Sequence, residues 1–318
     1  MGKKITTGDL ELWVEHQGQG PDVLLIAGLG DPAEAWQYQL DGLADHYRLT
    51  AFDNRGVGRT PPPDEPLSPA SMADDVAALL HALDVPAAHV AGFSMGSAIA
   101  QELALCHPGL VRSLVLVGTY ARPDALFRAK LDFWRWLPEA APSARAFYEA
   151  FFTWVYTTRA HADGTVAQLV EEALAYPHPQ SLEGFQAQVD ACLRHDTANR
   201  LTQIAAPTLV LAGELDAILP PRFGRFVAEQ IPNARIEVMP GEAHQPFQEV
   251  PERFDERVDA FWRALDTGGD GQATTLPRCS GSPSPSPPRS RRGWRRRSTP
   301  APAPACGPAA SSSSSSTW

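Results

Sequence analysis

The feature that most restricts the fold is segment 92–96, Gly-Phe-Ser-Met-Gly. An apolar run from His89 leads into it, and a helical pattern from Ser97 to Cys106 follows at once. So short a turn leaves no room for side chains on either side of the serine, and glycines 92 and 96 remove them. We therefore predict a strained turn that holds the Ser94 hydroxyl above the carboxyl edge of a sheet. The helix N-terminus beside it favours developing negative charge.

Five-residue patterns of this kind also arise by chance in ordinary strand–turn–helix corners, so the surrounding elements decide the fold. After an expected N-terminal hairpin over 5–16, buried apolar runs alternate with helical patterns. We expect strands over 23–27, 47–52, 89–93, 113–117, 208–212 and 235–239, and helices over 34–43, 71–83, 97–106, 223–230 and 251–265. Such alternation predicts an α/β fold with a mostly parallel, doubly wound sheet.

Polar and glycine-rich motifs follow three of these strands. Gly28-Leu29, Asp53-Asn54 and Ser94 each stand at a carboxyl end. Ligands of doubly wound sheets bind beyond those ends. We therefore expect the functional site at this edge.

The strand–helix alternation stops between residues 120 and 200, which look helical throughout. This segment holds 13 of the 27 aromatic residues of the chain. We expect a helical cap over an apolar pocket, although most of these rings would equally fill a core of the cap itself. Our candidate pocket residues are Trp36, Phe93, Trp134, Trp136 and Phe152. Arg135 is a candidate to bind a substrate carboxylate, or a solvated helix charge.

The composition predicts a core of residues 1–119 and 201–266, a cap over 120–200 and a separate tail over 267–318. The tail is rich in Ser, Pro and Arg and carries +6, whereas residues 1–266 carry −16. We expect the tail to be disordered, because it has too little apolar surface to bury. An out-of-frame C-terminus is an alternative origin.

Several classes of protein are disfavoured by composition. The acidic body argues against a nucleic-acid partner. The four cysteines show no metal-binding spacing, so we expect neither a metal nor a disulfide framework. No signal peptide follows Met1, and no run of 18 apolar residues exists. We therefore expect a cytoplasmic protein without a membrane partner; its oligomeric state is left open.

A serine nucleophile requires a base, and the base requires a group that orients it. Asp216 and His244 each follow one of the last two strands, on the same edge as Ser94. We predict that these three residues form a catalytic triad. Glu214 is a rival acid, and His195-Asp196 is the nearest rival pair.

An oxyanion hole requires two backbone N–H groups. One is expected from Met95, directly after the serine. The other is expected from the loop after strand 23–27, where Leu29 is our candidate.

Five motifs in this order resemble the α/β-hydrolase superfamily over residues 5–266. They are Gly28-Leu29-Gly30 with Trp36, segment 53–58, segment 92–96, segment 207–216 and Gly241-Glu242-Ala243-His244. Within it, the pattern looks like the branch of small bacterial esterases, enol-lactonases and cofactor-free perhydrolases. The resemblance implies a cap before the last two strands, and loops braced by Asp53 and Arg55. Ala27 departs from the histidine of many relatives, while a serine at 94 differs from the aspartate of dehalogenases and epoxide hydrolases.

The resemblance and the predicted triad lead us to expect a serine hydrolase that cleaves a small carboxylic ester or lactone without a cofactor. Three alternatives remain open. They are C–C bond or enol-lactone hydrolysis of aromatic catabolism, perhydrolysis, and a catalytically silent role in ligand binding. A silent protein would not need an intact triad and would not react with a fluorophosphonate.

Overall fold

The fold is taken from a computed structural model, which describes residues 2–62 and 64–267. Eight strands form one sheet in the order β1-β2-β4-β3-β5-β6-β7-β8. Their bounds are β1 Lys3–Thr7, β2 Leu10–Gln17, β3 Asp22–Ile26, β4 Arg48–Phe52, β5 Ala88–Phe93, β6 Val111–Val117, β7 Thr208–Gly213 and β8 Ala234–Met239.

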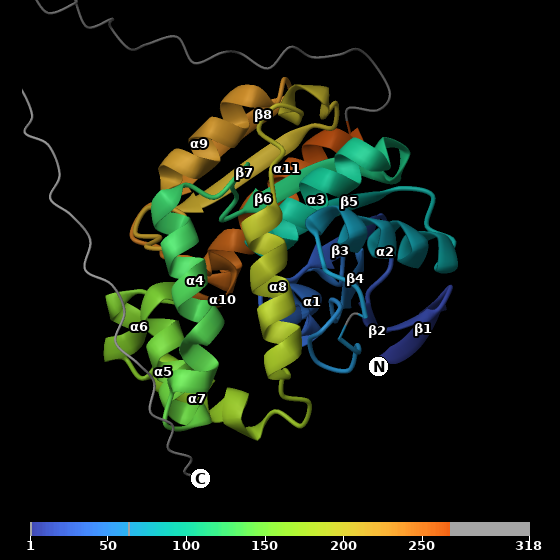
Figure 1. The fold of residues 1–318 in the computed structure, drawn as a ribbon. Helices are drawn as coiled ribbons and strands as arrows, with labels where there is room; N and C mark the ends of the chain where they lie inside the picture. Colours follow the sequence, from blue (N-terminus) through green and yellow to red (C-terminus); the bar gives the residue numbers. More distant parts are fainter. Residues whose placement is uncertain (1, 63, 268–318) are drawn as a thin grey trace, which may run out of the picture. The chain divides into compact units, whose positions relative to one another are not determined.

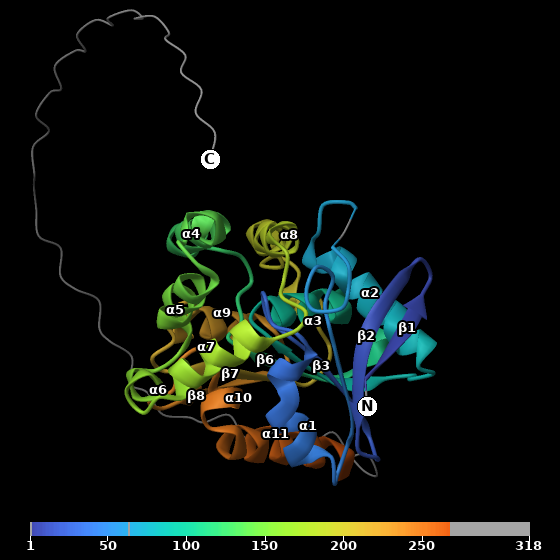
Figure 2. The ribbon, with the colours of Figure 1, turned by 90° about the horizontal axis from the view of Figure 1, so that it is seen from below.

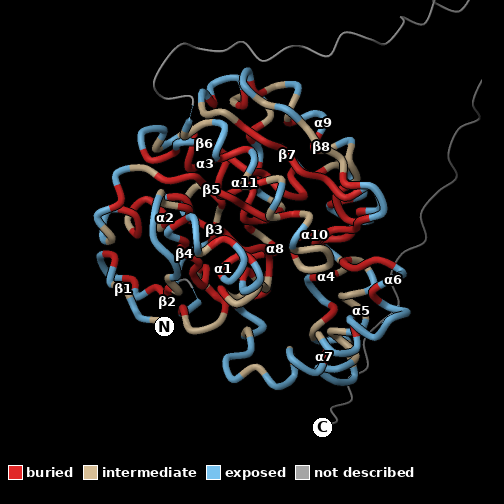
Figure 3. The backbone as a smooth tube through the Cα atoms, turned by 180° about the vertical axis from the view of Figure 1, so that it is seen from behind, coloured by how far each residue is buried: buried red, intermediate tan, exposed pale blue. Residues whose placement is uncertain are grey.

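The sheet is antiparallel at one edge and parallel elsewhere. β1 pairs with β2, and β2 pairs with β4, in antiparallel register. All pairs from β4 to β8 are parallel. The central strands are mostly apolar and buried, as expected where helices cover both of their faces. Figure 3 accordingly shows β3, β5 and β6 as buried.

The helices include three short 3-10 segments. Their bounds are η1 Ala33–Trp36, α1 Gln37–Leu43, α2 Pro69–Ala82, α3 Met95–Cys106, η2 Pro108–Leu110, α4 Ala125–Ala140, α5 Ala144–Val155, α6 Thr158–Ala162, α7 Thr165–Ala175, α8 Leu182–Arg194, η3 Leu201–Gln203, α9 Pro221–Gln230, α10 Pro246–Glu249 and α11 Pro251–Thr267.

Two hydrophobic clusters lie on opposite faces of the sheet, and successive side chains of β7 belong to each cluster in turn. Leu209 and Leu211 belong to the cluster of α1, α10 and α11, whereas Val210 belongs to the cluster of α2, α3 and α9. Side chains of a strand point to opposite faces in turn, so both layers are anchored by the same strand. Figure 2 shows α1 and α11 on one side of the sheet and α2 and α3 on the other.

The chain leaves the sheet after β6 and returns at β7, and α4–α8 lie between these strands (Figure 1). The parallel strands and helices predicted from the sequence are present, with ends that shift by one or two residues. The short α10, which begins at a proline, was not expected. Our exact domain boundaries stay predictions, and the predicted tail lies outside the described residues apart from Thr267, the last residue of α11. Among the residues that the structure describes, no helix is long and apolar enough to cross a membrane.

Candidate active site

Ser94 occupies a sharp turn between β5 and α3. Its φ of 52° lies in a region that residues other than glycine rarely adopt. A Cβ at position 92 would lie 2.3 Å from the carbonyl oxygen of Gly96, and one at position 96 would lie 2.2 Å from that of Ile26. Both positions therefore require glycine. Strain of this kind costs on the order of 1–3 kcal/mol and is concentrated at functional sites.

Ser94, His244 and Asp216 lie in a line of hydrogen bonds, although they come from three separate loops. The Ser94 hydroxyl is 3.0 Å from Nε2 of His244. On the opposite side of the ring, Nδ1 of His244 lies 2.6 Å from Oδ2 of Asp216. The carboxylate can only accept, so Nδ1 carries the proton and Nε2 of the neutral ring is left to accept from Ser94. This geometry can pass a proton from the serine to the histidine.

The Asp216 carboxylate is buried and held from its other side by backbone donors. Its Oδ1 accepts from the N–H groups of Ile218 and Leu219, both at 2.8 Å. These bonds turn Oδ2 toward His244. Asp216 therefore has two functions: it stabilises the turn, as aspartate often does, and it orients the imidazole of His244.

The His244 ring is held by its backbone and by its packing. The backbone N–H of His244 donates to the carbonyl of Val155, at the end of α5, at 3.0 Å. The Phe93 ring lies 4.7 Å from the imidazole. A Cβ at Gly118 would approach the ring to 3.0 Å, and Gly118 has a φ of 53°.

The rival candidates lie elsewhere. Glu214 is exposed and accepts from the N–H of Gly241 at 2.9 Å. His195 is buried against Tyr120 and contacts Thr197, while Asp196 accepts from the N–H of Ala198. Neither rival contacts Ser94 or His244 within the described part of the chain.

The N–H groups of Leu29 and Met95 have no protein acceptor among the described residues. Met95 opens α3, where the first N–H groups have no partner within the helix. The neighbouring N–H of Gly30 donates instead to Oε1 of Gln188 at 3.0 Å. Leu29 and Met95 thus keep free donors, as an oxyanion hole requires.

Asp53 and Arg55 brace the loops beside the site. The buried Asp53 carboxylate accepts from the N–H groups of Ala33 and Arg59, each at 2.8 Å. Burial, the largest effect, raises the pKa of Asp53 although these donors lower it. Arg55 forms a two-point ion pair with Asp75.

Asn54 contributes to the same bracing. Its Nδ2 donates to the carbonyl of Ala27 at 3.1 Å, which fixes the start of the glycine-rich loop, residues 28–30.

A cavity of about 540 Å³ opens between loop 29–35 and the inserted helices. α5, α7 and segment 176–182 supply most of its remaining wall, and Phe152 is the one predicted pocket residue that lines it. Ser94 and His244 are not among its lining residues, but Leu29 is, and the preceding loop 27–28 packs against Phe93 and Gly96 beside the Ser94 turn. Ser94 is thereby near a space large enough for a small organic substrate.

The other predicted pocket residues do not line this cavity. Trp36 is buried on the sheet face that α1, α10 and α11 cover, and its ring stacks on that of Phe247 with 4.3 Å between ring centres. Phe93 lies beneath the His244 ring. Trp134 is buried against Phe151.

Trp136 and Arg135 also lie away from the cavity. Trp136 is 50% exposed on the outside of α4. Arg135 is also exposed and pairs with Asp190, so it behaves as a solvated helix charge.

Two residues at the site were missed from the sequence. Gln188, fully buried on α8, joins the glycine-rich loop to the Arg55 carbonyl, since its Nε2 donates there at 2.9 Å. Asp31 lines the cavity, and burial raises its pKa to about 7, opposed by the charge of His244 and a bond from Gln245. A glutamine on a helix has no sequence pattern that predicts such a role. Asp31 directly follows the Gly28–Gly30 motif, and this position could have indicated a role at the site.

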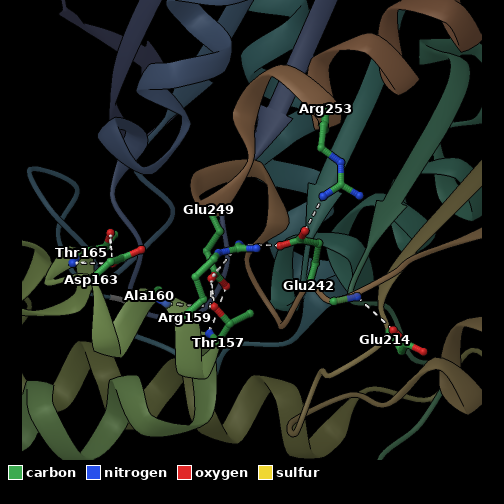
Figure 4. Close-up of polar contacts among 10 residues, drawn as sticks. Thr157, Arg159, Ala160, Asp163, Thr165, Glu214, Glu242, Glu249 and Arg253 are labelled. Atoms are coloured by element: carbon green, nitrogen blue, oxygen red, sulfur yellow. Dashed lines mark hydrogen bonds and ion pairs between the residues drawn. The ribbon is translucent and has the colours of Figure 1, made fainter.

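Ion pairs tie the His244 loop to α6 (Figure 4). Glu242 accepts from Arg159 at 2.9 Å and also pairs with Arg253. The Thr157 N–H donates to Glu249 at 3.2 Å, and its hydroxyl bonds the same carboxylate. Both carboxylates are 1% exposed, so charged and N–H partners compensate their burial.

Comparison with known proteins agrees with this fold. The family model described as alpha/beta hydrolase fold matches residues 21–249. A protein of Azorhizobium caulinodans named “Putative carbamate hydrolase RutD” is 34% identical over 260 residues, 81% of this chain and 97% of that protein. The pimeloyl-acyl-carrier-protein methyl ester esterase of Aeromonas hydrophila is 30% identical over 261 residues, 78% of this chain and 98% of the esterase.

Solved structures give the same result. A thermophilic esterase from Thermogutta terrifontis superposes with a TM-score of 0.74 at 27% identity, covering 83% of this chain and 99% of the esterase. The family match spans most of the chain, and the relatives are matched over nearly their whole length. The chain therefore belongs to the α/β-hydrolase fold family, as a hydrolase.

Proposed function

We propose that the protein is a serine hydrolase that cleaves a small carboxylic ester or lactone. The line of hydrogen bonds from Asp216 through His244 to Ser94 is the observation that carries this proposal. A serine hydroxyl becomes an effective nucleophile when a base accepts its proton and a third group orients that base. These three residues offer those roles in the order found in this fold.

In the first half of the reaction, Oγ of Ser94 attacks the ester carbonyl carbon while its proton passes to Nε2 of His244. The negative carbonyl oxygen accepts hydrogen bonds from the N–H groups of Leu29 and Met95. Asp216 stabilises the imidazolium. Collapse of the tetrahedral intermediate breaks the bond to the alcohol, which leaves with the proton from His244.

In the second half, water enters and His244 removes one of its protons. The hydroxide that forms attacks the acyl carbon, and the same two N–H groups hold the oxyanion. The bond to Ser94 then breaks, the serine oxygen takes its proton from His244, and the free acid departs. Each oxyanion donor contributes about 3–4 kcal/mol to transition states of this type.

We further propose that residues 120–200 act as a cap that selects the substrate. The cavity beneath the cap is lined by Phe147, Phe151, Phe152 and Phe185, which favour an apolar group beside the ester. An esterase and a protein named a carbamate hydrolase are among the relatives, so esters and carbamates belong in a first panel. A cytoplasmic location stays a prediction.

The test is hydrolysis of p-nitrophenyl esters, simple lactones and phenyl carbamates, with wild type beside Ser94→Ala. Turnover that Ser94→Ala reduces by a factor of about 10³ or more is expected. Equal turnover by both proteins would overturn the proposal.

A folded wild-type protein that hydrolyses nothing and does not label with a fluorophosphonate would also overturn the proposal, in favour of ligand binding. Labelling without turnover would contradict simple ester hydrolysis and direct attention to C–C substrates. Adding peroxide to the assay tests perhydrolysis.

A further inference from the structure

Asp31 stands out among the carboxyl groups around the site because few protein groups bind it. Its Oδ2 accepts one long hydrogen bond, 3.3 Å from Nε2 of Gln245. Within the described residues, no Lys or Arg pairs with it, and besides Gln245 a backbone hydrogen bond from Gly28 favours its charged form. Asp31 is one of the residues that line the cavity.

Other carboxylates near the site are well compensated. Asp53 accepts two backbone N–H groups and a contact from Arg59. Glu34 pairs with Arg59 and accepts from the Tyr176 hydroxyl. Glu242 binds two arginines. Asp31 is half-buried and has fewer donors than these carboxylates, so a substrate group that donates to it would complete its hydrogen bonding.

The position of Asp31 says where that partner would be. An ideal Cβ on Gly28 would lie 2.8 Å from Oδ2 of Asp31, so the carboxyl group rests directly on the glycine-rich loop that supplies the Leu29 N–H. Its side-chain donor, Gln245, follows His244 in the chain. Asp31 is therefore held between the two loops that approach the scissile carbonyl in the proposed reaction.

The charged residues of the cavity wall favour a substrate that carries a hydrogen-bond donor over a substrate that carries a carboxylate. Asp31, Glu34 and Glu172 line the cavity, and its described lining contains no Lys or Arg. Gln245 also has a buried Oε1 without a partner, so this corner of the site has more acceptors than donors. A substrate carboxylate would meet like charge here, whereas a hydroxyl or an ammonium group would meet an acceptor.

We propose that Asp31 is a specificity-determining residue that accepts a hydrogen bond from a hydroxyl or ammonium group on the substrate, close to the scissile carbonyl. This inference rests on the proposed ester hydrolysis and narrows its substrate class to esters that carry such a donor. Burial that raises the pKa of the carboxyl group to about 7 agrees with a site that has few donors until substrate arrives.

The experiment compares substrates that differ only in the donor, in a pH-stat at pH 8. On the acyl side, methyl glycolate is compared with methyl propanoate, and β-alanine methyl ester, whose amine stays protonated at this pH, is compared with methyl butanoate. On the alcohol side, 2-hydroxyethyl acetate is compared with propyl acetate. For each pair the ratio of kcat/KM is measured for wild type, Asp31→Leu and Asp31→Asn, so that the intrinsic reactivity of the esters cancels.

The ratio is expected to be higher in wild type than in Asp31→Leu by about tenfold or more in at least one pair, because a hydrogen bond to a charged acceptor is lost. Asp31→Asn, which keeps the shape and one acceptor oxygen, should fall between them and replaces the leucine variant if that does not fold. Glu172→Leu, which removes a wall carboxylate that already binds Gln168, should keep the wild-type ratio.

Ratios that do not differ between wild type and both Asp31 variants, while Ser94→Ala abolishes turnover, would overturn the role of Asp31 and leave the hydrolase proposal standing. Absence of Ser94-dependent turnover of every ester would overturn both. A ratio that Glu172→Leu lowers as much as Asp31→Leu would also contradict the proposal, since general wall charge would then account for the selectivity.

Discussion

At the scale of single residues, each of the three side chains of the proposed triad is held in place by a different local interaction. Ser94 is held by its backbone conformation, with φ of 52°. Asp216 is held by two N–H groups, and His244 by a backbone bond to Val155. Side chains whose positions are fixed before substrate binds lose little freedom in the transition state. Substitutions that keep the shape of these residues but change their chemistry are therefore the most informative.

Asp216→Asn is expected to lower kcat by a factor of roughly 10³–10⁴ with little change in fold, because an amide no longer fixes the correct tautomer of His244. Steady-state kinetics with a p-nitrophenyl ester measures this effect. Glu214→Gln is the matched control, since Glu214 is exposed and bonds only to the Gly241 backbone. A larger loss in the control than in Asp216→Asn would identify Glu214 as the orienting acid.

His195 makes the fold sensitive to acid. Burial, the largest effect, lowers its pKa to about 4, against 6.5 in an exposed histidine. Between pH 6.5 and 4 the unfolded chain binds the extra proton, so the free energy of unfolding falls as the pH falls through this window. His195→Asn should therefore lose roughly 2–3 kcal/mol less than wild type between pH 7 and pH 4.5.

Urea unfolding at the two pH values measures the difference. Absolute stability of the variant does not matter, because each protein is compared with itself. An equal loss in wild type and His195→Asn would show that other groups cause the acid sensitivity.

At the scale of elements, the His244 loop is joined to the inserted helices at several points. The backbone of His244 bonds to the end of α5, Glu249 binds Thr157, which caps α6, and Glu242 binds Arg159 of α6. These bonds make the position of the base depend on the cap. Movement of the cap against the sheet would therefore also move Nε2 of His244.

Arg159→Gln is expected to lower kcat by about three- to tenfold, because small misplacements of a catalytic group reduce the rate strongly. Its effect on the free energy of unfolding should be about 1–3 kcal/mol, because Arg159 is half exposed but its partners Glu242 and Glu249 are buried carboxylates. Arg159→Lys should restore part of kcat.

Arg145→Gln is the control for Arg159→Gln. Arg145 pairs with Glu171 within the cap and does not contact the His244 loop. An equal fall of kcat in both variants would contradict a specific link between α6 and His244.

Elements with a strong apolar pattern could be predicted from the sequence, and this fixed where the candidate site lies. β3, β5 and β7 are mostly apolar runs, so the loops that follow them had to meet at one edge. The sequence did not predict toward which surface of the fold each aromatic side chain points. Trp36 follows loop 28–30 in sequence, yet it packs on the sheet face that α1, α10 and α11 cover, where it stacks on Phe247 of α10. Gln188 escaped prediction because its bonds span more than 130 residues.

At the scale of the whole molecule, every strand of the sheet and every candidate site residue lies before the end of α11 at Thr267. α11 packs through Phe254, Val258, Phe261 and Trp262 against the sheet face that also holds Trp36. The last element of the chain that the structure describes is thus part of the main core.

A chain that ends at Thr267 is expected to keep the Tm and the kcat/KM of the full chain within about 2 °C and twofold, since both layers of the sheet remain complete. Shortening the chain further, to Arg253, should unfold the protein because it removes most of α11. Thermal unfolding and ester hydrolysis of the three chains test this. A 1–267 chain that does not fold would assign residues 268–318 a part in the fold.

The most direct test of the account is the site of reaction with a fluorophosphonate, read by mass spectrometry of the intact protein and its peptides. The account predicts one adduct per chain, on the peptide that contains Ser94. The adduct should be absent in Ser94→Ala and form at least about 10³-fold more slowly in His244→Ala, because only the activated hydroxyl reacts. An adduct on another residue, or undiminished labelling of Ser94 without His244, would contradict the assignment of Ser94, His244 and Asp216 as a catalytic triad.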